Sequence, residues 1–511
     1  MPSTFRAAIL LAAGAVAAAP AAQAEVTAGQ VWSGWRASMT DAGYDVTSTE
    51  TRAGDRLTIT DLVMRVDMPE DNSTLTVTMA EMAFVDNGDG TVSVVLPPDL
   101  PIGVSVSGED TEEVDLGMSY ETVDQSITVS GDPDDMTFAY AAASAGLSLV
   151  DVVVEGQPVD MAEFGGATLT IADLAGTTRV QLGDDLRRSV QQVSSGALSY
   201  LMDFSEPEGG DGRILLRGGA DAMDIRADVS LPRDMDPERM GEMLKQGFAV
   251  DVGMAFEGGT SRFEVAGDGQ AAQGSSHSTD FNLRLAMDGE RLSYGGEVSG
   301  LDISMAGGDL PFPVDIAMEK TGFNIEMPTS GGATPQPFAL GLTLGGFTTS
   351  EMIWGMLDPA GQLPRDPATV AFDITGTARL TAALLDAGKM AAMDFQKTLP
   401  VKVDALRING LTVSAAGAEL TGAGGFTFDN SDTETFQGMP APDGEINLTL
   451  VGGNGLLDTL VGMGLVPEDQ ANGLRMMMGL FAVPAEGEDR LTSKIEVKPD
   501  GQIVANGQRI Q

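Results

Sequence analysis

The sequence has no cysteine and a single histidine, His277, among its 511 residues. No disulfide can form, and zinc, copper, haem and iron–sulfur sites of the usual kinds lack their Cys and His ligands. After the N-terminal segment, no stretch approaches the roughly 20 apolar residues of a transmembrane helix. There is neither a G-x-G-x-x-G turn after a strand nor a P-loop. We therefore predict no cofactor, no metal site, no catalytic residue and no membrane-spanning segment in the mature chain.

Basic residues are also scarce. Lys and Arg total 29 against 75 Asp and Glu, so the formal net charge is −46. Such a field repels nucleic acid and anionic lipid headgroups, and we expect no nucleic-acid partner. The simplest explanation of the charge is a surface that stays hydrated in saline surroundings. Composition leaves the oligomeric state open.

The first 24 residues predict a cleaved secretion signal. Arg6 precedes an apolar run, Ala7–Ala19, and small residues follow at Ala22 and Ala24. This order is typical of a signal peptide, with cleavage between Ala24 and Glu25. A secreted chain without cysteine is expected in the periplasm of a Gram-negative bacterium.

The clearest structural pattern is a pair of alternating segments, Arg56–Asp67 and Thr74–Phe84. If residue 66 pairs with residue 75 in an antiparallel hairpin, every apolar residue faces another: 64 with 77, 62 with 79, 59 with 82 and 57 with 84. Both segments slip by one position, at Thr60–Asp61 and Ala80–Glu81. Because side chains alternate between faces, either the apolar face swaps there or the strands carry a bulge.

Similar alternation recurs along the chain, and we also assign the ambiguous segment Asp184–Phe204 to strands. Helices are predicted at 28–43, 236–244, 351–357, 380–393, 455–463 and 467–481. The predicted fold is mainly β (α+β): an elongated antiparallel β-sheet meander with a few short helices at sheet ends and a C-terminal helical pair. Gly- and Pro-rich stretches divide the secreted region 25–511 into sub-lobes 25–235, 236–400 and 401–511.

Two local patterns suggest chemistry, and each has a simpler explanation. His277 lies in a polar segment beside Ser276 and Asp280. Ser-His-Asp triads are assembled from distant segments, so we interpret this one as a solvated loop. Val85–Val92, VDNGDGTV, resembles a calcium loop, but glycine occupies positions that need oxygen ligands, and a hairpin turn explains it better. Weak calcium binding by surface acids stays open.

Thr349–Gly376 has the densest mixture of Trp, Arg, Asp and Pro in the chain. A short helix carrying Trp354 is followed by prolines and a strand. Arg365 has Asp358 and Asp366 close in sequence and can bind one carboxylate through two nitrogens. We interpret the segment as a structural corner held by an ion pair. The alternative is a site for an anionic ligand under Trp354.

The same residues carry a family resemblance. The pattern IW-x-M-x-DP-x3-LPRDPAT-x3-D-x-TG, with LPFPVDIAMEK before it, resembles an uncharacterised alphaproteobacterial secreted family known only as a domain of unknown function. The tryptophan-bearing first helix and the C-terminal VPEDQ…IVANG also fit. The resemblance implies no activity and no site residues. More loosely, GLTVSAAGAELTGAGGFTF, with the helices and the closing hairpin after it, is similar to the C-terminal ends of AsmA-like envelope proteins, whose long amphipathic sheets form a groove for lipid chains.

The predicted function is non-enzymatic and periplasmic: the protein binds or shuttles an apolar or amphipathic envelope molecule, such as a lipid. The many alternating strands and the 28 methionines, which adapt to varied ligands, motivate this hypothesis. One alternative is an envelope scaffold that binds protein partners through sheet edges. A third is a carboxylate-based hydrolase, which needs two acids facing each other at roughly 5–9 Å.

Overall fold

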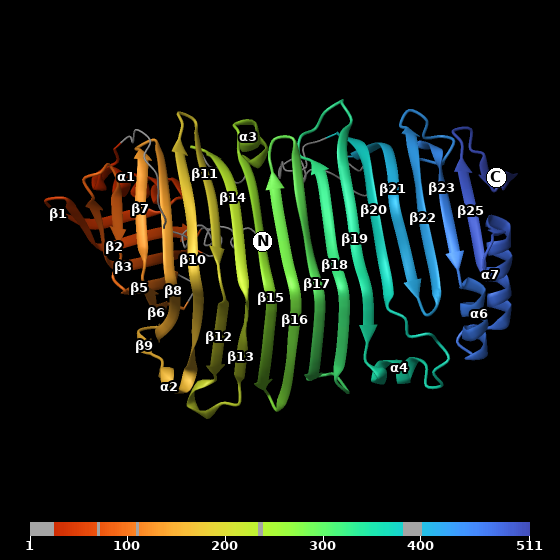
Figure 1. Cartoon of the computed structure of the whole chain (residues 1–511), viewed down its shortest axis with the longest axis horizontal. Coiled ribbons are helices and arrows are strands. Elements are labelled where there is room, and N and C mark those ends of the chain that lie inside the picture. The colour runs from red at the N-terminus through yellow and green to blue at the C-terminus, as the bar shows by residue number, and fades with distance from the viewer. Residues whose placement is uncertain (1–24, 69–71, 109–111, 234–238, 382–400, 511) are drawn as a thin grey trace. The chain divides into compact units, whose positions relative to one another are not determined.

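A computed structural model describes residues 25–68, 72–108, 112–233, 239–381 and 401–510. The predicted signal peptide, through Ala24, lies outside the described residues, as do the start of the predicted helix 236–244 and nearly all of the one at 380–393. The chain divides into two units, unit 1 with residues 1–235, 247–277 and 305–312, and unit 2 with residues 236–246, 278–304 and 313–511. Both are built on antiparallel strands with few helices, which confirms the predicted mainly β meander (Figure 1).

Unit 1 is a sheet in which every pairing of its described strands is antiparallel. Pairing runs β1–β2–β3–β5–β6–β8–β10, then through β11–β14 and β12–β13 to β15, while β4 and β7 link β3 to β8. The bounds are α1 Ala28–Asp41, β1 Asp45–Ala53, β2 Arg56–Met68, β3 Ser73–Asp86, β4 Val92–Val95, β5 Asp99–Gly108, β6 Val114–Val123, β7 Ser126–Asp132, β8 Asp135–Val154, β9 Gln157–Pro158, α2 Met161–Phe164, β10 Gly165–Leu182, β11 Leu186–Ser195, β12 Leu198–Ser205, η2 Pro207–Gly209, β13 Arg213–Ala220, β14 Ala222–Pro232 and β15 Ala249–Gly267.

Unit 2 is a simpler meander. Strands β18 to β23 pair in chain order, and β25, β26 and β27 follow, as the neighbouring arrows in Figure 1 show for β18 to β23. The bounds are α3 Met240–Lys245, β18 Val314–Pro328, β19 Gln336–Thr349, α4 Glu351–Leu357, β20 Ala368–Leu380, β21 Val401–Ala415, β22 Ala418–Asp429, β23 Ala441–Val451, α6 Gly453–Gly462, α7 Glu468–Phe481, β24 Val483–Pro484, β25 Arg490–Val497, β26 Ile503–Ala505 and β27 Gln508–Arg509; residues of β16 Gln270–Met287 and β17 Arg291–Gly307 are divided between the units.

Helix α1 supplies the core of unit 1. Thr27 caps it through a reciprocal capping box with Gln30, and the Asp86 carboxylate accepts the Ala28 N–H at 2.6 Å. Trp32 is 2% exposed and donates its indole N–H to Glu50 at 2.8 Å. The helix thereby covers one region of the apolar sheet face, and its buried side chains are part of the main hydrophobic cluster of the described residues.

The predicted hairpin is confirmed in register. Strands β2 and β3 pair 66 with 75, 64 with 77, 62 with 79, 59 with 82 and 57 with 84. The phase slip does not move the apolar residues to another packing surface, because Ile59 and Leu62, on either side of it, belong to one cluster. Instead Asp61 adopts φ 50°, a left-handed conformation that interrupts the alternation of side chains by one residue. The apolar side chains before and after it therefore lie on the same face.

The same device recurs in other long strands. In unit 1, Asp173 of β10 has φ 50° and Gly258 of β15 has φ 64°. In unit 2, Gly300 of β17 has φ 57° and Gly346 of β19 has φ 67°. On β15 the apolar residues are even-numbered before the kink at Gly258 and odd-numbered after it, so this slip in the alternation coincides with a left-handed residue.

Two further predictions about local structure have clear outcomes. The ambiguous segment Asp184–Phe204 is strand, as expected, in β11 and β12. The interpretation of His277 as part of a loop is wrong: it is an exposed residue within β16. This part of β16 consists of small and polar residues such as Ser276, without apolar residues at alternate positions. The sequence therefore shows no hydrophobic pattern by which the strand could be predicted.

Candidate functional site

The corner after β19 is held together by a buried carboxylate. Asp358, which follows α4, is fully buried, and its Oδ2 accepts the Leu363 N–H at 2.7 Å. Hydrogen bonds from the backbone of Gln362 first, and of Leu363 second, hold the pKa of Asp358 below its usual value. The side chain therefore organises its own loop and faces no opening.

Arg365 makes a different ion pair from the two that the sequence suggested. Its guanidinium pairs with Glu351, in the first turn of α4, rather than with Asp358 or Asp366. It also lies 5.8 Å from the centre of the Trp354 ring, within cation–π range. Asp366 is an exposed residue of the loop. The four predicted residues thus gather at one corner, where the arginine is already bound by protein groups.

The carboxylates of the calcium-like turn, and that of Asp135 at the start of β8, are bound by other groups of the protein. Asp89 accepts the backbone N–H of Thr91 at 3.0 Å and its hydroxyl at 2.6 Å, which lowers the pKa of Asp89. Asp86 binds helix α1 and Arg52. Asp135 pairs with Arg179, whose hydrogen bonds lower the pKa of that aspartate. Among the described residues, no group of three or more His, Cys, Asp or Glu is placed to hold a metal ion.

Where the structure shifts a carboxylate pKa among the residues it describes, the shift is downward. Glycoside hydrolysis by two carboxylates needs one acid with a raised pKa. The electrostatics of these described acids are those of structural ion pairs and turn caps.

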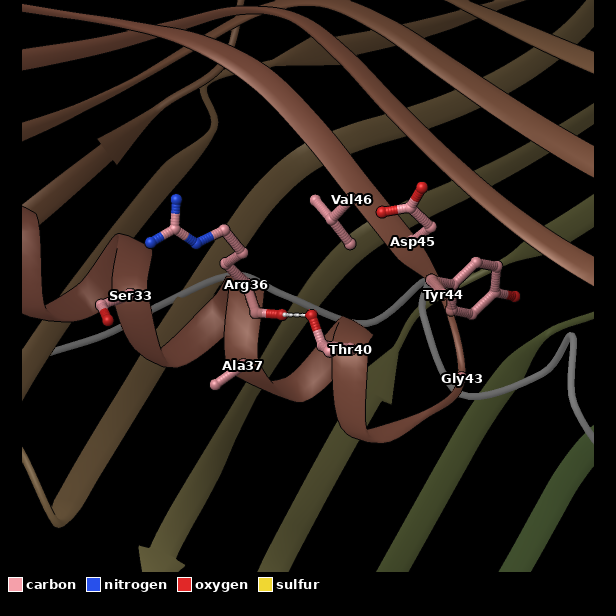
Figure 2. A pocket seen from close by; sticks show the side chains of 8 residues that line it. All are labelled: Ser33, Arg36, Ala37, Thr40, Gly43, Tyr44, Asp45 and Val46. Atoms are coloured by element: carbon pink, nitrogen blue, oxygen red, sulfur yellow. Dashed lines mark hydrogen bonds between the residues drawn. The ribbon is translucent and has the colours of Figure 1, made fainter.

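Figure 2 shows a hollow beside α1 in unit 1. Two of its polar groups are bound within the protein: Arg36 pairs with Glu50 at 3.0 Å, and the Thr40 hydroxyl donates to the Arg36 carbonyl at 3.0 Å. Tyr44 is 8% exposed. A second hollow in unit 1 is lined by Arg213, which pairs with Asp203 at 3.0 Å, and by several alanines. Among the described residues that line the two hollows, no hydroxyl group is hydrogen-bonded to a carboxylate.

The most extended chemical feature of unit 2 is one face of its sheet. Cross-strand pairing aligns its apolar residues into continuous rows, and Phe323, Leu342, Phe372 and Leu411 form one row across β18 to β21. A neighbouring row is Ile325, Leu340, Ile374, Ile408, Gly424, Ile446 and Ile495, and another is Thr321, Leu344, Val370, Val413, Leu420, Leu450 and Leu491. We call the residues of these three rows the apolar face of unit 2.

No charged side chain belongs to these three rows in the described strands β18 to β25. Ion pairs use other positions: Lys494 pairs with Glu445 at 2.8 Å at positions of opposite alternation, and Arg379 pairs with Asp404, which lies at a register irregularity of β21. Several side chains of the apolar face are exposed, with Leu340 and Val370 at 42% and Val413 at 40%. A sheet with one charged and one charge-free face normally buries the latter against a second layer.

Glycines leave space for larger side chains to lie flat on the side of the sheet that carries the apolar face of unit 2. A Cβ placed on Gly376 would lie 2.5 Å from the ring of Phe338, and one on Gly422 would lie 2.6 Å from a methyl group of Leu448. Each glycine therefore gives space to the side chain of a neighbouring strand. The arrangement covers part of the apolar surface without a second layer.

Unit 1 carries a comparable face, but protein groups cover more of it. Its rows include Met64, Val77, Val104, Leu116 and Val152 across β2 to β8. Helix α1 packs on the region nearest β2, and the ring of Phe164 of α2 lies tilted against that of Phe204, with 5.0 Å between the ring centroids. Arg187 also lies on this face, donating to Ser38 of α1, and burial lowers its pKa. The charge-free face of unit 2 is the better candidate for a ligand.

Comparison with known proteins identifies a family and nothing more specific. Residues 251–507 match the model of a family described as "Uncharacterized protein conserved in bacteria (DUF2125)". No curated protein and no solved structure matches the chain. The match leaves out the tryptophan-bearing first helix, and no comparison shows the similarity to AsmA-like proteins. None of the helices that the structure describes has the length and apolarity that a membrane crossing requires.

Proposed function

The chain belongs to this uncharacterized bacterial family, and because membership assigns no activity, we propose from the structure that it binds the apolar chain of a lipid-like envelope molecule without catalysis. The observation that carries the proposal is the apolar face of unit 2, which combines register-matched rows, exposed aliphatic side chains and the absence of charged residues from those rows. The predicted N-terminal signal peptide supports a periplasmic location for this function.

The energetics favour an extended apolar ligand. Strands lie about 4.8 Å apart, so the rows from β18 to β25, over seven strands, extend for about 29 Å. Burying methylene groups against such a surface contributes about 0.8 kcal/mol each, so about twelve of them give a gross gain near 10 kcal/mol. Much of that gain is offset by the immobilisation of the ligand. Binding of moderate affinity and easy release suits a carrier.

The scaffold alternative has less support from the edge strands. Among the described strands, β1 pairs only with β2, so its other edge could accept a partner strand. However, β1 carries an irregularity between Thr47 and Thr49, and charged Glu50 and Arg52 lie on it. Bulges and charges are the means by which proteins keep edges from pairing. The edge strand therefore carries features that oppose strand addition.

The test is a matched pair of substitutions on β19. Leu342→Asp places a carboxylate between Phe323 and Phe372 on the apolar face. Thr343→Asp adds the same charge on the opposite face, between Gly322 and Ala371. We expect Leu342→Asp to weaken binding of dodecylphosphocholine at least about ten-fold, since a carboxylate in an apolar contact is strongly unfavourable. Thr343→Asp should bind as the parent does.

Isothermal titration calorimetry below the micellar concentration measures this binding, and circular dichroism checks that both variants fold. Lipid extraction and mass spectrometry of protein purified from its native periplasm provide the second readout. The proposal fails if the folded parent binds no amphiphile and carries no lipid. It also fails if Leu342→Asp and Thr343→Asp bind equally, because the ligand would then lie elsewhere.

A further inference from the structure

The charges around the apolar face of unit 2 restrict the chemistry of the ligand's polar end. The three rows themselves offer no charged partner among the described residues, so a headgroup must lie beyond the ends of the strands. Residues 313–511 contain 24 Asp and Glu against 12 Lys and Arg. The two strand ends decide which charge a headgroup meets.

At the end where α4 follows β19, two of the cations are already paired. Arg365 binds Glu351 and lies over Trp354, and Arg475 of α7 binds Asp458 of α6. The Glu351 side chain remains 81% exposed in its pair. An anionic headgroup would have to break an existing ion pair before it found a cation at these positions.

At the opposite end, the turn between β22 and β23 presents carboxylates. Asp429 accepts the Ser431 hydroxyl at 2.6 Å, and Asp432 accepts the Thr435 hydroxyl at 2.7 Å. These hydrogen bonds lower the pKa of both aspartates, so both are ionised at neutral pH. The nearby Arg379 is bound by Asp404, which lies beside Asn430.

We infer that the ligand of the apolar face of unit 2 is an amphiphile whose polar end carries no net negative charge, such as a zwitterionic or cationic headgroup. This inference rests on the proposed function and adds the chemical class of the ligand. Repulsion between ionised acids and an anionic headgroup is long-ranged at low ionic strength, where the Debye length is about 30 Å at 0.01 M, and is screened at 1 M, where it is about 3 Å.

Three amphiphiles with the same twelve-carbon chain test it: dodecylphosphocholine, dodecyltrimethylammonium and dodecanoate. Each is titrated calorimetrically below its micellar concentration into the full mature chain at pH 8, in 0.01 M and 1 M salt. Dodecanoate should bind about ten-fold more weakly than dodecylphosphocholine at low salt and within about two-fold at high salt. The ammonium compound should bind at least as tightly as the zwitterion. Leu342→Asp should weaken binding of dodecylphosphocholine while Thr343→Asp does not, which ties the preference to this face.

The outcomes separate the two claims. Dodecanoate bound as tightly as the zwitterion at low salt overturns the inference and leaves the proposed function standing. Tighter binding of dodecanoate, with loss of affinity as salt rises, overturns it in the same way and indicates an unrecognised cationic site. Absence of binding by all three amphiphiles to the folded chain, together with absence of lipid from the protein purified from its native periplasm, removes the proposed function itself. A double substitution, Asp429→Asn with Asp432→Asn, should strengthen dodecanoate binding relative to Glu468→Gln with Asp469→Asn, which removes the same charge at α7.

Discussion

The left-handed conformation of Asp61 in β2 allows a quantitative prediction about the stability of unit 1. Asp61 is exposed and adopts φ 50° in the middle of a strand whose apolar residues on both sides pack in one core. Replacing it by glycine should leave the stability of unit 1 unchanged or raise it. Replacing it by valine should lower that stability.

The magnitudes come from the backbone conformation. A left-handed conformation costs an L-residue about 1–2 kcal/mol, which glycine does not incur. Glycine loses about 0.5–1 kcal/mol through its greater freedom in the unfolded chain. Asp61→Gly should therefore change the free energy of unfolding by about 0 to +1.5 kcal/mol. Asp61→Val should reduce it by about 1–2 kcal/mol, because a β-branched side chain tolerates this conformation least.

The control is Thr58→Gly on the same strand, where the residue pairs with Ala83 and Thr51 in regular register. There glycine only removes strand preference and adds unfolded-state entropy, so stability should fall by about 1–2 kcal/mol. Urea unfolding is followed by tryptophan fluorescence in a Trp354→Phe background, so that Trp32 and Trp35 report on unit 1 alone. If Asp61→Gly is as destabilising as Thr58→Gly, the kink is not the feature that keeps the apolar side on one face.

Three further predictions concern unit 2. Gly376→Ala should cost about 1–3 kcal/mol, measured by urea unfolding, because its Cβ meets an aromatic ring and a carbonyl oxygen, whereas Gly410→Ala, with open space, should be nearly neutral. The pKa of Asp358 is depressed, so the contribution of its carboxylate to folding stability is fully present above the usual pKa of 3.8 and is lost as the pH falls through the lower pKa of the folded state. An acid titration followed by Trp354 fluorescence should show this step, and Asp358→Asn should abolish it. Arg365→Ala should shift Trp354 emission and destabilise the corner by about 0.5–1 kcal/mol without changing dodecylphosphocholine affinity; lost affinity in a stable variant would make the corner a binding site.

Local hairpins were predictable from the sequence because their two strands adjoin and their apolar residues select one register. For β2 and β3 a single pairing brings all apolar residues into contact, and the structure has that pairing. The alternation alone could not separate a swapped face from a bulge, since both produce the same slip. The backbone angle at Asp61 distinguishes them.

The corner shows where sequence proximity misleads. Arg365 has acidic neighbours at positions 358 and 366, yet a folded chain can bring a more distant group closer. Asp358 turns inward to its own loop, and the start of α4 brings Glu351 to the guanidinium. Nothing in the local pattern ranks Glu351 above the nearer acids, because the choice depends on the path of the loop.

The apolar face of unit 2 could have been found from the same pairing rule that identified the first hairpin. Phe323 with Leu342, and Leu342 with Phe372, are pairings between consecutive alternating segments. The irregularities near Gly346 and Asn409 interrupt the alternation and conceal its continuity. His277 is the opposite case, since its strand lacks an apolar set and leaves no pattern to detect.

A charge-free sheet face without a second layer among the described residues raises the question of how such a protein avoids association through it. Two features of the structure answer it. Glycines such as Gly376 let neighbouring rings lie flat and reduce the area each exposes, so the face is only partly open. The net charge of −46 adds repulsion between copies, which opposes contact through any surface at low ionic strength. The same repulsion acts on anionic ligands, so keeping the face free of other copies and selecting a ligand without negative charge are consequences of one charge distribution.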